Sequence, residues 1–166
     1  ITTGACDTQD RIKDGIYPFF VRSQKVEKIN KFSFDGEAIL TSGDGVGVGK
    51  IFHYINGKFD FHQRVYCIHG FRKNVDGKYF FNQFSNHFFD RVMSMTAKSS
   101  VDSVRREMIA DMKIYLPPTK KEQTTIALIL SDMDLKIKSL ENKKVKYQEI
   151  KQGMMQELLT GKTRLV

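Results

Sequence analysis

The sequence is poor in residues that mark several common classes of protein. Its 166 residues include no tryptophan, three prolines and two cysteines, and Cys6 and Cys67 provide neither a disulfide framework nor a Cys-x-x-Cys metal site. The four histidines never form a His-Glu-x-x-His pair, so they are interpreted as surface or strand residues rather than zinc ligands. No apolar run reaches membrane-spanning length and no signal peptide is visible, which predicts a soluble, cytoplasmic protein without a membrane partner. Because the chain begins at Ile1, we expect its natural N-terminus to lie upstream.

Glycine, in contrast, is concentrated in the stretch TSGDGVGVGK at residues 41–50. A Walker A loop needs Gly-x-x-x-x-Gly-Lys followed by Ser or Thr, but Asp44 stands at the first glycine position and Ile51 follows Lys50. The dinucleotide fingerprint Gly-x-Gly-x-x-Gly fails as well. The alternating glycines predict an extended strand with a glycine face open to another backbone or a ligand, and a glycine-rich turn between strands is equally compatible.

Positive charge dominates the composition. Twenty-seven Lys and Arg residues against 19 Asp and Glu residues give a net charge of +8. A domain this basic commonly binds nucleic acid or another polyanion. Composition alone is also compatible with a basic protein that binds neither.

Residues 1–117 are predicted to form an α+β globule with a mixed sheet. The segments YPFFVRS, EAILTSG and KIYLPP are interpreted as strands, and Asn56-Gly57 predicts a hairpin turn between two runs rich in Ile, Phe, Tyr and Val. After a turn at Asp76-Gly77, apolar residues recur at intervals of three and four, which predicts an amphipathic helix. Its apolar positions are Phe81, Phe84, Phe88, Val92 and Met95. The segment VRREMIADM predicts a short basic helical turn.

Residues 118–166 differ in character and predict one long helix. Thr119 and Glu122 match the capping box Thr-x-x-Glu, directly after Pro117-Pro118. No proline follows, and no glycine appears before Gly153. A helix of about 40 residues would be roughly 60 Å long at 1.5 Å per residue.

A heptad pattern in this region predicts a coiled coil. Its d positions are Ile126, Met133, Leu140, Tyr147 and Met154, and its apolar a positions are Leu130, Ile137 and Leu158. Lys144 and Lys151 interrupt the a positions, which lowers stability but can fix the register and orientation of the pairing. A narrow apolar stripe on so long a helix predicts a partner helix, with packing along its own globule as the alternative.

The residues themselves resemble a known family. The segment LPPTKKEQ, the helix after it and the closing KQGMMQELLTG resemble the long-helix region of the specificity subunit of type I restriction-modification enzymes. Upstream, YPFFVRS and EAILTSGDGVGVGKIFHYINGKFDFHQRVY resemble one target-recognition domain of that family. The resemblance covers nearly the whole chain, and it implies a target-recognition globule followed by a coiled-coil spacer helix.

The resemblance also implies a division of labour between subunits. A specificity subunit carries two recognition domains, held apart by antiparallel helices, and each reads half of a split DNA target. Modification subunits bring S-adenosylmethionine and methylate adenine, while the restriction subunit brings cleavage, with ATP and Mg on these partners. This chain has one recognition domain and one helical region, so the resemblance implies a half-subunit that dimerises or a fragment of a two-domain subunit. No cofactor or catalytic residue is expected in the chain: Leu116-Pro117-Pro118-Thr119 lacks the end residues of an adenine methyltransferase Asn/Asp-Pro-Pro-Tyr/Phe motif.

Recognition of DNA needs phosphate contacts that position and base contacts that specify. The residues expected to contact phosphates are Lys50, Lys98, Arg105 and Arg106. Gln63 and Arg64 are expected to read base edges, because Gln suits adenine and Arg suits guanine. Ser42, Ser99 and Ser100 complete the predicted set. For each of these side chains, taken alone, a purely solvated surface role is the more common one, since most basic residues of a basic protein face water.

Three classes of function are therefore compared. The leading hypothesis is a non-catalytic subunit that recognises double-stranded DNA together with modification and restriction subunits. The second is a coiled-coil adaptor whose basic globule binds protein or another anionic ligand. The third is a nucleotide-using enzyme, which the failed glycine spacing disfavours.

Overall fold

The computed structural model describes residues 1–95 and 103–165, in an α+β fold that confirms the predicted class. The chain divides into two compact units, Ile1–Thr124 and Thr125–Val166, so the division lies slightly beyond the predicted change of character at residue 118. The elements in chain order are β1 (Thr2–Thr3), η1 (Thr8–Asp10), β2 (Tyr17–Phe20), β3 (Glu27–Ile29), β4 (Phe34–Ser42), β5 (Phe52–Phe61), β6 (Val65–His69), α1 (Gly77–Ser94), α2 (Arg106–Ala110) and α3 (Lys120–Leu159).

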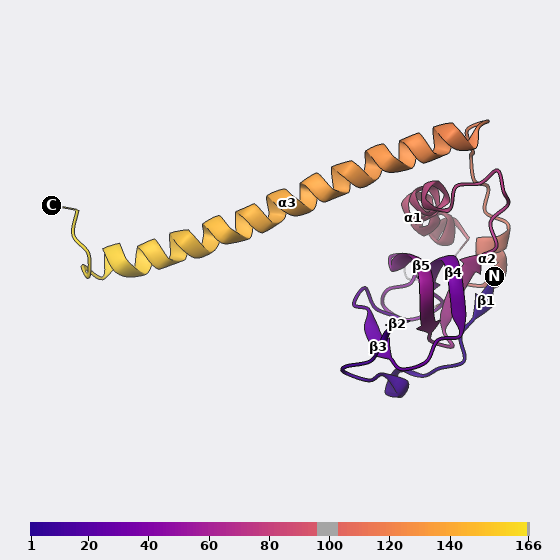
Figure 1. Ribbon diagram of the computed structural model, residues 1–166, viewed down its shortest axis with the longest axis horizontal. Helices are drawn as coiled ribbons and strands as arrows, with labels where there is room; N and C mark the ends of the chain where they lie inside the picture. The colour runs from indigo at the N-terminus through magenta and orange to yellow at the C-terminus, as the bar shows by residue number, and fades with distance from the viewer. Residues whose placement is uncertain (96–102, 166) are drawn as a thin grey trace. The chain divides into compact units, whose positions relative to one another are not determined.

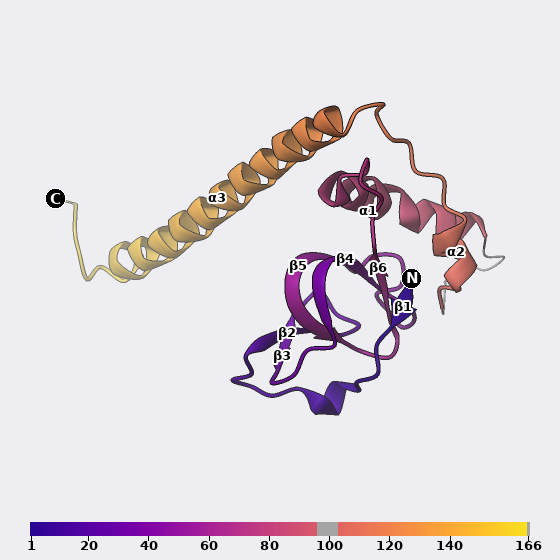
Figure 2. The same cartoon turned by 45° about the vertical axis from the view of Figure 1, so that its right-hand side comes forward.

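A six-stranded mixed sheet forms the centre of the first unit. Its strand order is β1-β6-β4-β5-β2-β3, in which β2 and β5 run parallel and the other neighbours run antiparallel. The strands β4 and β5 curve strongly, as Figure 2 shows. The predicted strands YPFFVRS and EAILTSG correspond to β2 and β4.

The central strand β4 is buried on both faces, which explains why it reads as a nearly continuous apolar run. Ile39 belongs to a cluster with residues of α1 and α2, whereas its neighbours Ala38 and Leu40 belong to a second cluster on the other face. All three side chains are fully buried. The sheet therefore packs against α1 and α2 on one face (Figure 1). On the other face, side chains of the curved strands themselves pack together in a second apolar cluster.

Helix α1 confirms the predicted amphipathic helix. Asp76 is its N-cap, and the carboxylate accepts a hydrogen bond from the Tyr79 amide at 2.8 Å. Phe84 and Phe88 stack with ring centroids 4.5 Å apart inside the core. The predicted pair Asp76-Gly77 is thus the start of the helix, where the N-cap side chain satisfies an amide that lacks an intrahelical partner.

The predicted hairpin turn at Asn56-Gly57 is wrong. Both residues lie inside β5, where Asn56 pairs with Glu37 and Gly57 pairs with Gly36. A two-residue type I′ turn needs positive φ at both central residues, but among the described residues only glycines have positive φ. Long-range pairing with β4 therefore overrides the local turn preference of the Asn-Gly dipeptide.

The glycine-rich stretch forms a loop and not the predicted extended strand. It connects β4 to β5, and the amides of Val48 and Lys50 donate to the carbonyls of Gly45 and Gly47 at 3.1 and 3.0 Å. Gly45 has φ 83°, a left-handed conformation that suits glycine. The alternative of a turn between strands is the one observed.

The predicted strand KIYLPP is also absent from the sheet. Residues 112–117 have no regular secondary structure, and Tyr115 is 79% exposed. The carbonyl of Tyr115 accepts a hydrogen bond from the Tyr79 hydroxyl at 3.1 Å rather than from a neighbouring strand. This hydrogen bond ties an irregular segment to α1.

Helix α3 confirms the predicted long helix, with 40 residues that continue through Gly153. Thr119 caps it, because its hydroxyl accepts a hydrogen bond from the Glu122 amide at 3.2 Å. The predicted seam is exposed over most of its length: Ile137 is 54%, Leu140 65% and Tyr147 59% exposed. In residues 1–95 and 103–165, no helix is long and apolar enough to cross a membrane.

Candidate nucleic-acid interface

A tight turn between β5 and β6 presents the two residues predicted to read bases, Gln63 and Arg64. The Val65 amide donates to the His62 carbonyl at 2.9 Å and closes the turn. The His62 side chain lies beneath it, and its Nδ1 accepts from the Arg64 amide at 2.9 Å. Gln63 and Arg64 are therefore exposed side chains on a turn whose backbone is held from below.

His62 is suited to this supporting role as a neutral imidazole. It is 2% exposed, and burial, followed by the positive charge of Arg22, lowers its pKa. Since Nδ1 accepts the Arg64 amide hydrogen, the proton of the neutral ring is assigned to Nε2, which lies 3.8 Å from a carboxylate oxygen of Asp7. The β5–β6 turn thus depends on a buried, uncharged histidine.

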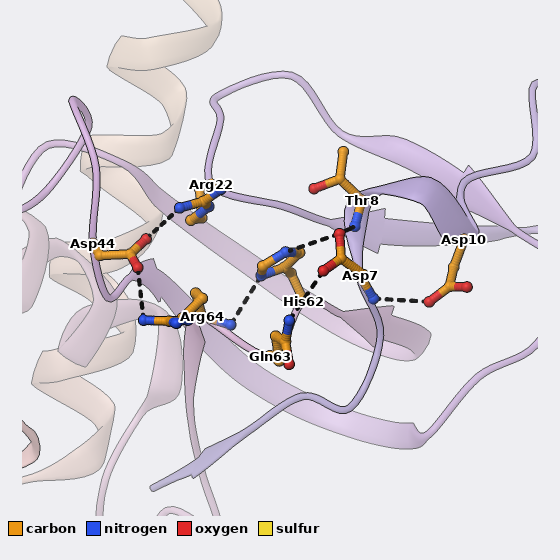
Figure 3. A network of polar contacts seen from close by, with 8 residues as sticks. All are labelled: Asp7, Thr8, Asp10, Arg22, Asp44, His62, Gln63 and Arg64. Carbon is orange, nitrogen blue, oxygen red and sulfur yellow. Dashed lines mark hydrogen bonds and ion pairs between the residues drawn. The ribbon is translucent and has the colours of Figure 1, made fainter.

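Gln63 is held by a carboxylate from the N-terminal segment. Its Nε2 donates to Oδ2 of Asp7 at 3.0 Å. Asp7 is itself fixed as the N-cap of η1: its Oδ1 accepts from the Thr8 amide at 2.6 Å, and its own amide donates to Asp10 at 2.8 Å. Figure 3 shows this chain of contacts leading from η1 to the turn. The remaining amide hydrogen and the Oε1 of Gln63 are the groups that adenine recognition uses.

Arg64 is held by a second carboxylate, from the glycine-rich loop. Its guanidinium donates to Oδ2 of Asp44 at 3.2 Å, and Arg22 donates to Oδ1 of the same residue at 2.7 Å. Asp44 thus accepts from two arginines that come from different parts of the chain (Figure 3). Asp44, Gln63 and Arg64 also line one hollow of about 140 Å³.

Arg22 is absent from the predicted set of DNA-contacting residues. It lies two residues after the end of β2, and its side chain is 43% exposed. The segment YPFFVRS places a charged residue at the end of an apolar strand, and this pattern could have marked Arg22 as a candidate. Its link to Arg64 through Asp44 joins segments distant in sequence, so no local pattern could reveal it.

The other predicted contact residues are distributed differently. The predicted DNA contact of Ser42 is corrected, because this residue is 1% exposed at the end of β4. Its hydroxyl donates to the Asp44 carbonyl at 2.7 Å, so it stabilises the loop from inside. Lys50 is exposed, with Nζ 4.9 Å from the Phe89 ring centroid. Arg105 and Arg106 are exposed where α2 begins. The predicted residues Lys98, Ser99 and Ser100 lie outside the described residues.

The described residues do not contain a group of three or more His, Cys, Asp or Glu side chains that could hold a metal ion. The chemistry available at the β5–β6 turn is instead hydrogen bonding by amide and guanidinium groups. These are the groups with which proteins recognise the edges of bases and the phosphate backbone.

Comparison with known proteins assigns the chain to a family. Residues 1–152 match the model of the type I restriction modification DNA specificity domain. The chain belongs to this family. The match includes the whole sheet, α1, α2 and most of α3, so both units of this specificity-domain chain contribute to it.

Individual proteins are similar to the chain in sequence or in fold. The chain is 28% identical over 152 residues to the Type I restriction enzyme EcoDI specificity subunit of Escherichia coli, covering 92% of the chain and 32% of that protein. The fold matches the crystal structure of a type I restriction-modification S subunit from M. genitalium, with a TM-score of 0.70 at 10% identity over 93% of this chain and 41% of that one. A second structure, from work on complex assembly of the type I R-M system, matches with a TM-score of 0.56 at 11% identity over 95% of this chain and 42% of that one. The chain therefore spans about a third of the curated relative.

Proposed function

We propose that this chain recognises one half of a split DNA target and directs partner subunits that carry out the chemistry. The observation that carries the proposal is the specificity-domain match, which extends from the basic globule into α3. The net charge of +8 supports binding to a polyanion. A coiled-coil adaptor for protein is not favoured, because the family match includes the globule as well as the helix.

The proposed division of roles on the globule follows the side chains. Gln63 and Arg64 read base edges from the β5–β6 turn, each held by a carboxylate. Lys50, Arg105 and Arg106 contact phosphates. They are exposed cations and, among the described contacts, no carboxylate holds their side chains in place. Arg22 joins the first group through Asp44.

The proposed partners act through this surface and through α3. A modification subunit with S-adenosylmethionine would methylate adenine at the bound target, and a restriction subunit with ATP and Mg would cleave DNA. Helix α3 would pair antiparallel with a second copy of itself or with the helix of another recognition domain. The stripe offers a hollow of about 380 Å³ on its C-terminal part, where Tyr147, Lys151, Met154 and Leu158 of the predicted seam line it.

The DNA role is tested by titrating the chain against fluorescent duplexes at several salt concentrations. Affinity should fall with a log–log slope of about −0.9 per phosphate neutralised. Arg105→Ala with Arg106→Ala should weaken all sequences about equally and make the slope shallower by up to about two phosphates' worth. A change in the preferred sequence would show instead that these arginines read bases.

The subunit role is tested by co-purification with the modification subunit encoded in the same system, followed by mapping of methylated adenines. We expect a stable complex and methylation at a defined target. If the chain binds duplexes without salt dependence or sequence preference, and binds no modification subunit, the adaptor function is the better explanation.

A further inference from the structure

The surface proposed to bind DNA contains an acidic side chain, Asp44, which needs an explanation. Asp44 lies between Arg22 and Arg64, next to the turn proposed to read bases. A carboxylate near the phosphate backbone lowers the affinity for every DNA sequence, since both carry negative charge. Its presence therefore suggests a role in geometry rather than in attraction.

The geometry around Asp44 is tightly determined. Its side chain is 20% exposed, and its backbone carbonyl accepts from the buried Ser42 hydroxyl at 2.7 Å. Its backbone also forms an isolated bridge with Ser103. Both carboxylate oxygens are used, Oδ1 by Arg22 at 2.7 Å and Oδ2 by Arg64 at 3.2 Å. With one arginine on each oxygen, the carboxylate cannot rotate without breaking a contact.

Arg64 is the member of this trio that reaches furthest into solvent, with 64% of its side chain exposed against 43% for Arg22. A free arginine side chain loses considerable rotamer entropy when it binds. The bond to Asp44 removes part of that cost in advance. A guanidinium has five N–H donors, so one bond to Asp44 leaves enough donors for the paired contact with O6 and N7 of guanine.

We propose that Asp44 is a positioning residue that holds Arg64, with Arg22 on its second oxygen, as a pre-oriented reader of a guanine in the major groove. This inference rests on the proposed function. It assigns Asp44 to sequence discrimination, at a cost in general DNA affinity. Arg22 acts by locking the carboxylate that Arg64 uses.

This role predicts opposite effects of one substitution. Asp44→Asn keeps the size of the side chain and removes one negative charge. Affinity for an unrelated duplex should rise, by about two- to threefold, because a charge that repels phosphates is lost. Affinity for the target relative to the unrelated duplex should fall by about tenfold, because Arg64 loses its charged hydrogen-bond partner. A merely structural role would weaken both affinities together.

The test uses the full chain and a duplex selected by that chain from a randomised library, with a scrambled duplex as the unrelated probe. Asp35→Asn is the matched control, since Asp35 is exposed on β4 and the charge change is the same. Arg64→Lys is a second variant that keeps the charge but loses the paired donors; it should lower discrimination without raising the affinity for the scrambled duplex. Thermal unfolding of each variant checks that the globule remains folded.

The guanine is identified with 7-deazaguanine, which lacks the N7 acceptor, placed at each guanine of the selected duplex in turn. At one position the modified duplex should bind the wild-type chain about tenfold more weakly than the unmodified duplex does. The Asp44→Asn and Arg64→Lys chains should bind the two duplexes with nearly equal affinity, because they have already lost this contact. Equal loss in all three chains, or an Asp44→Asn chain with unchanged discrimination, would overturn the role of Asp44. A wild-type chain that selects no sequence at all would instead overturn the proposed function.

Discussion

The globule and helix α3 satisfy their apolar residues in different ways. Residues 1–124 contain a core of large side chains that neighbours within the unit cover: Phe88 is fully buried, against Phe84 and Phe52. In α3 the apolar seam residue Leu140 is 65% exposed. The globule therefore has an apolar core of its own, whereas the exposed apolar stripe of α3 supports the proposal that α3 pairs with a partner helix.

Buried polar groups join the start of α3 to the globule. Gln123 is 2% exposed; its Oε1 accepts from the Asp76 amide at 2.9 Å, and its Nε2 donates to the carbonyls of Asn74 and Pro117 at 3.2 and 3.1 Å. Thr124 adds a hydrogen bond to the Asp76 carboxylate at 2.7 Å. The first turn of α3, up to Thr124, is thus held by hydrogen bonds to the globule.

The largest effect is expected from charges on the seam. Ile137→Asp with Leu140→Asp places two carboxylates where the partner helix packs, and burying an unpaired charge costs several kcal/mol each. We expect the dimer to dissociate completely, as measured by light scattering. The matched control is Leu128→Asp with Leu135→Asp, the same chemical change at exposed positions on the opposite side of the heptad. A dimer that survives the seam variant as well as the control variant would refute the heptad assignment.

Within the globule, Phe88→Ala should cost about 3–5 kcal/mol of unfolding free energy, because it leaves a cavity in the cluster beneath α1. Leu128→Ala, at a 61% exposed position of α3, should change stability by about 0.5 kcal/mol or less. Urea denaturation followed by circular dichroism measures both. Similar losses for the two variants would mean that the contrast between buried globule and exposed helix is incorrect.

A smaller effect is expected at the junction. Gln123→Ala leaves the Asp76 amide and two carbonyls without their partner, which should cost about 1–3 kcal/mol. Gln152→Ala, on an exposed position of the same helix, is the control and should be nearly neutral. Equal stability of the two variants in urea denaturation would show that the network does not hold the start of α3.

The smallest effect concerns pH. Burial lowers the pKa values of His53, His62 and His69 below the ordinary value of 6.5. The unfolded chain therefore takes up protons before the folded chain does, so stability is full above pH 6.5 and falls as the pH drops below it. The thermal midpoint should decrease between pH 7.5 and pH 5.5, and His53→Gln should make that decrease smaller. A midpoint that rises over this range would contradict the burial of these rings.

Much of the fold could be predicted from periodicity. The spacing of three and four marked α1, the heptad with its capping box marked α3, and the apolar runs marked β2 and β4. The errors arose where distant segments decide the outcome. Asn56-Gly57 lies in β5 because β4 pairs with it. KIYLPP lies outside the sheet, and the Tyr79 hydroxyl ties it to α1 through the Tyr115 carbonyl.

The candidate site was predictable only in part. Gln63 and Arg64 could be proposed from their side-chain chemistry, and the structure places them on one turn. The carboxylates that hold them come from residues far away in the sequence, Asp7 and Asp44, as does Arg22. Hydrogen bonds between such segments depend on the sheet topology, which local patterns do not encode.

The most direct test of recognition by paired helices is methylation mapping with a chain that lacks one heptad, residues 137–143. The deletion removes about 10 Å of helix, or about three base pairs of B-DNA, and keeps the seam in register. For a homodimer we predict a split palindromic target whose spacer shortens by about that amount while the half-site bases stay the same. An unchanged spacer, or a continuous or asymmetric target for the homodimer, would contradict the proposal that α3 sets the distance between two recognition domains.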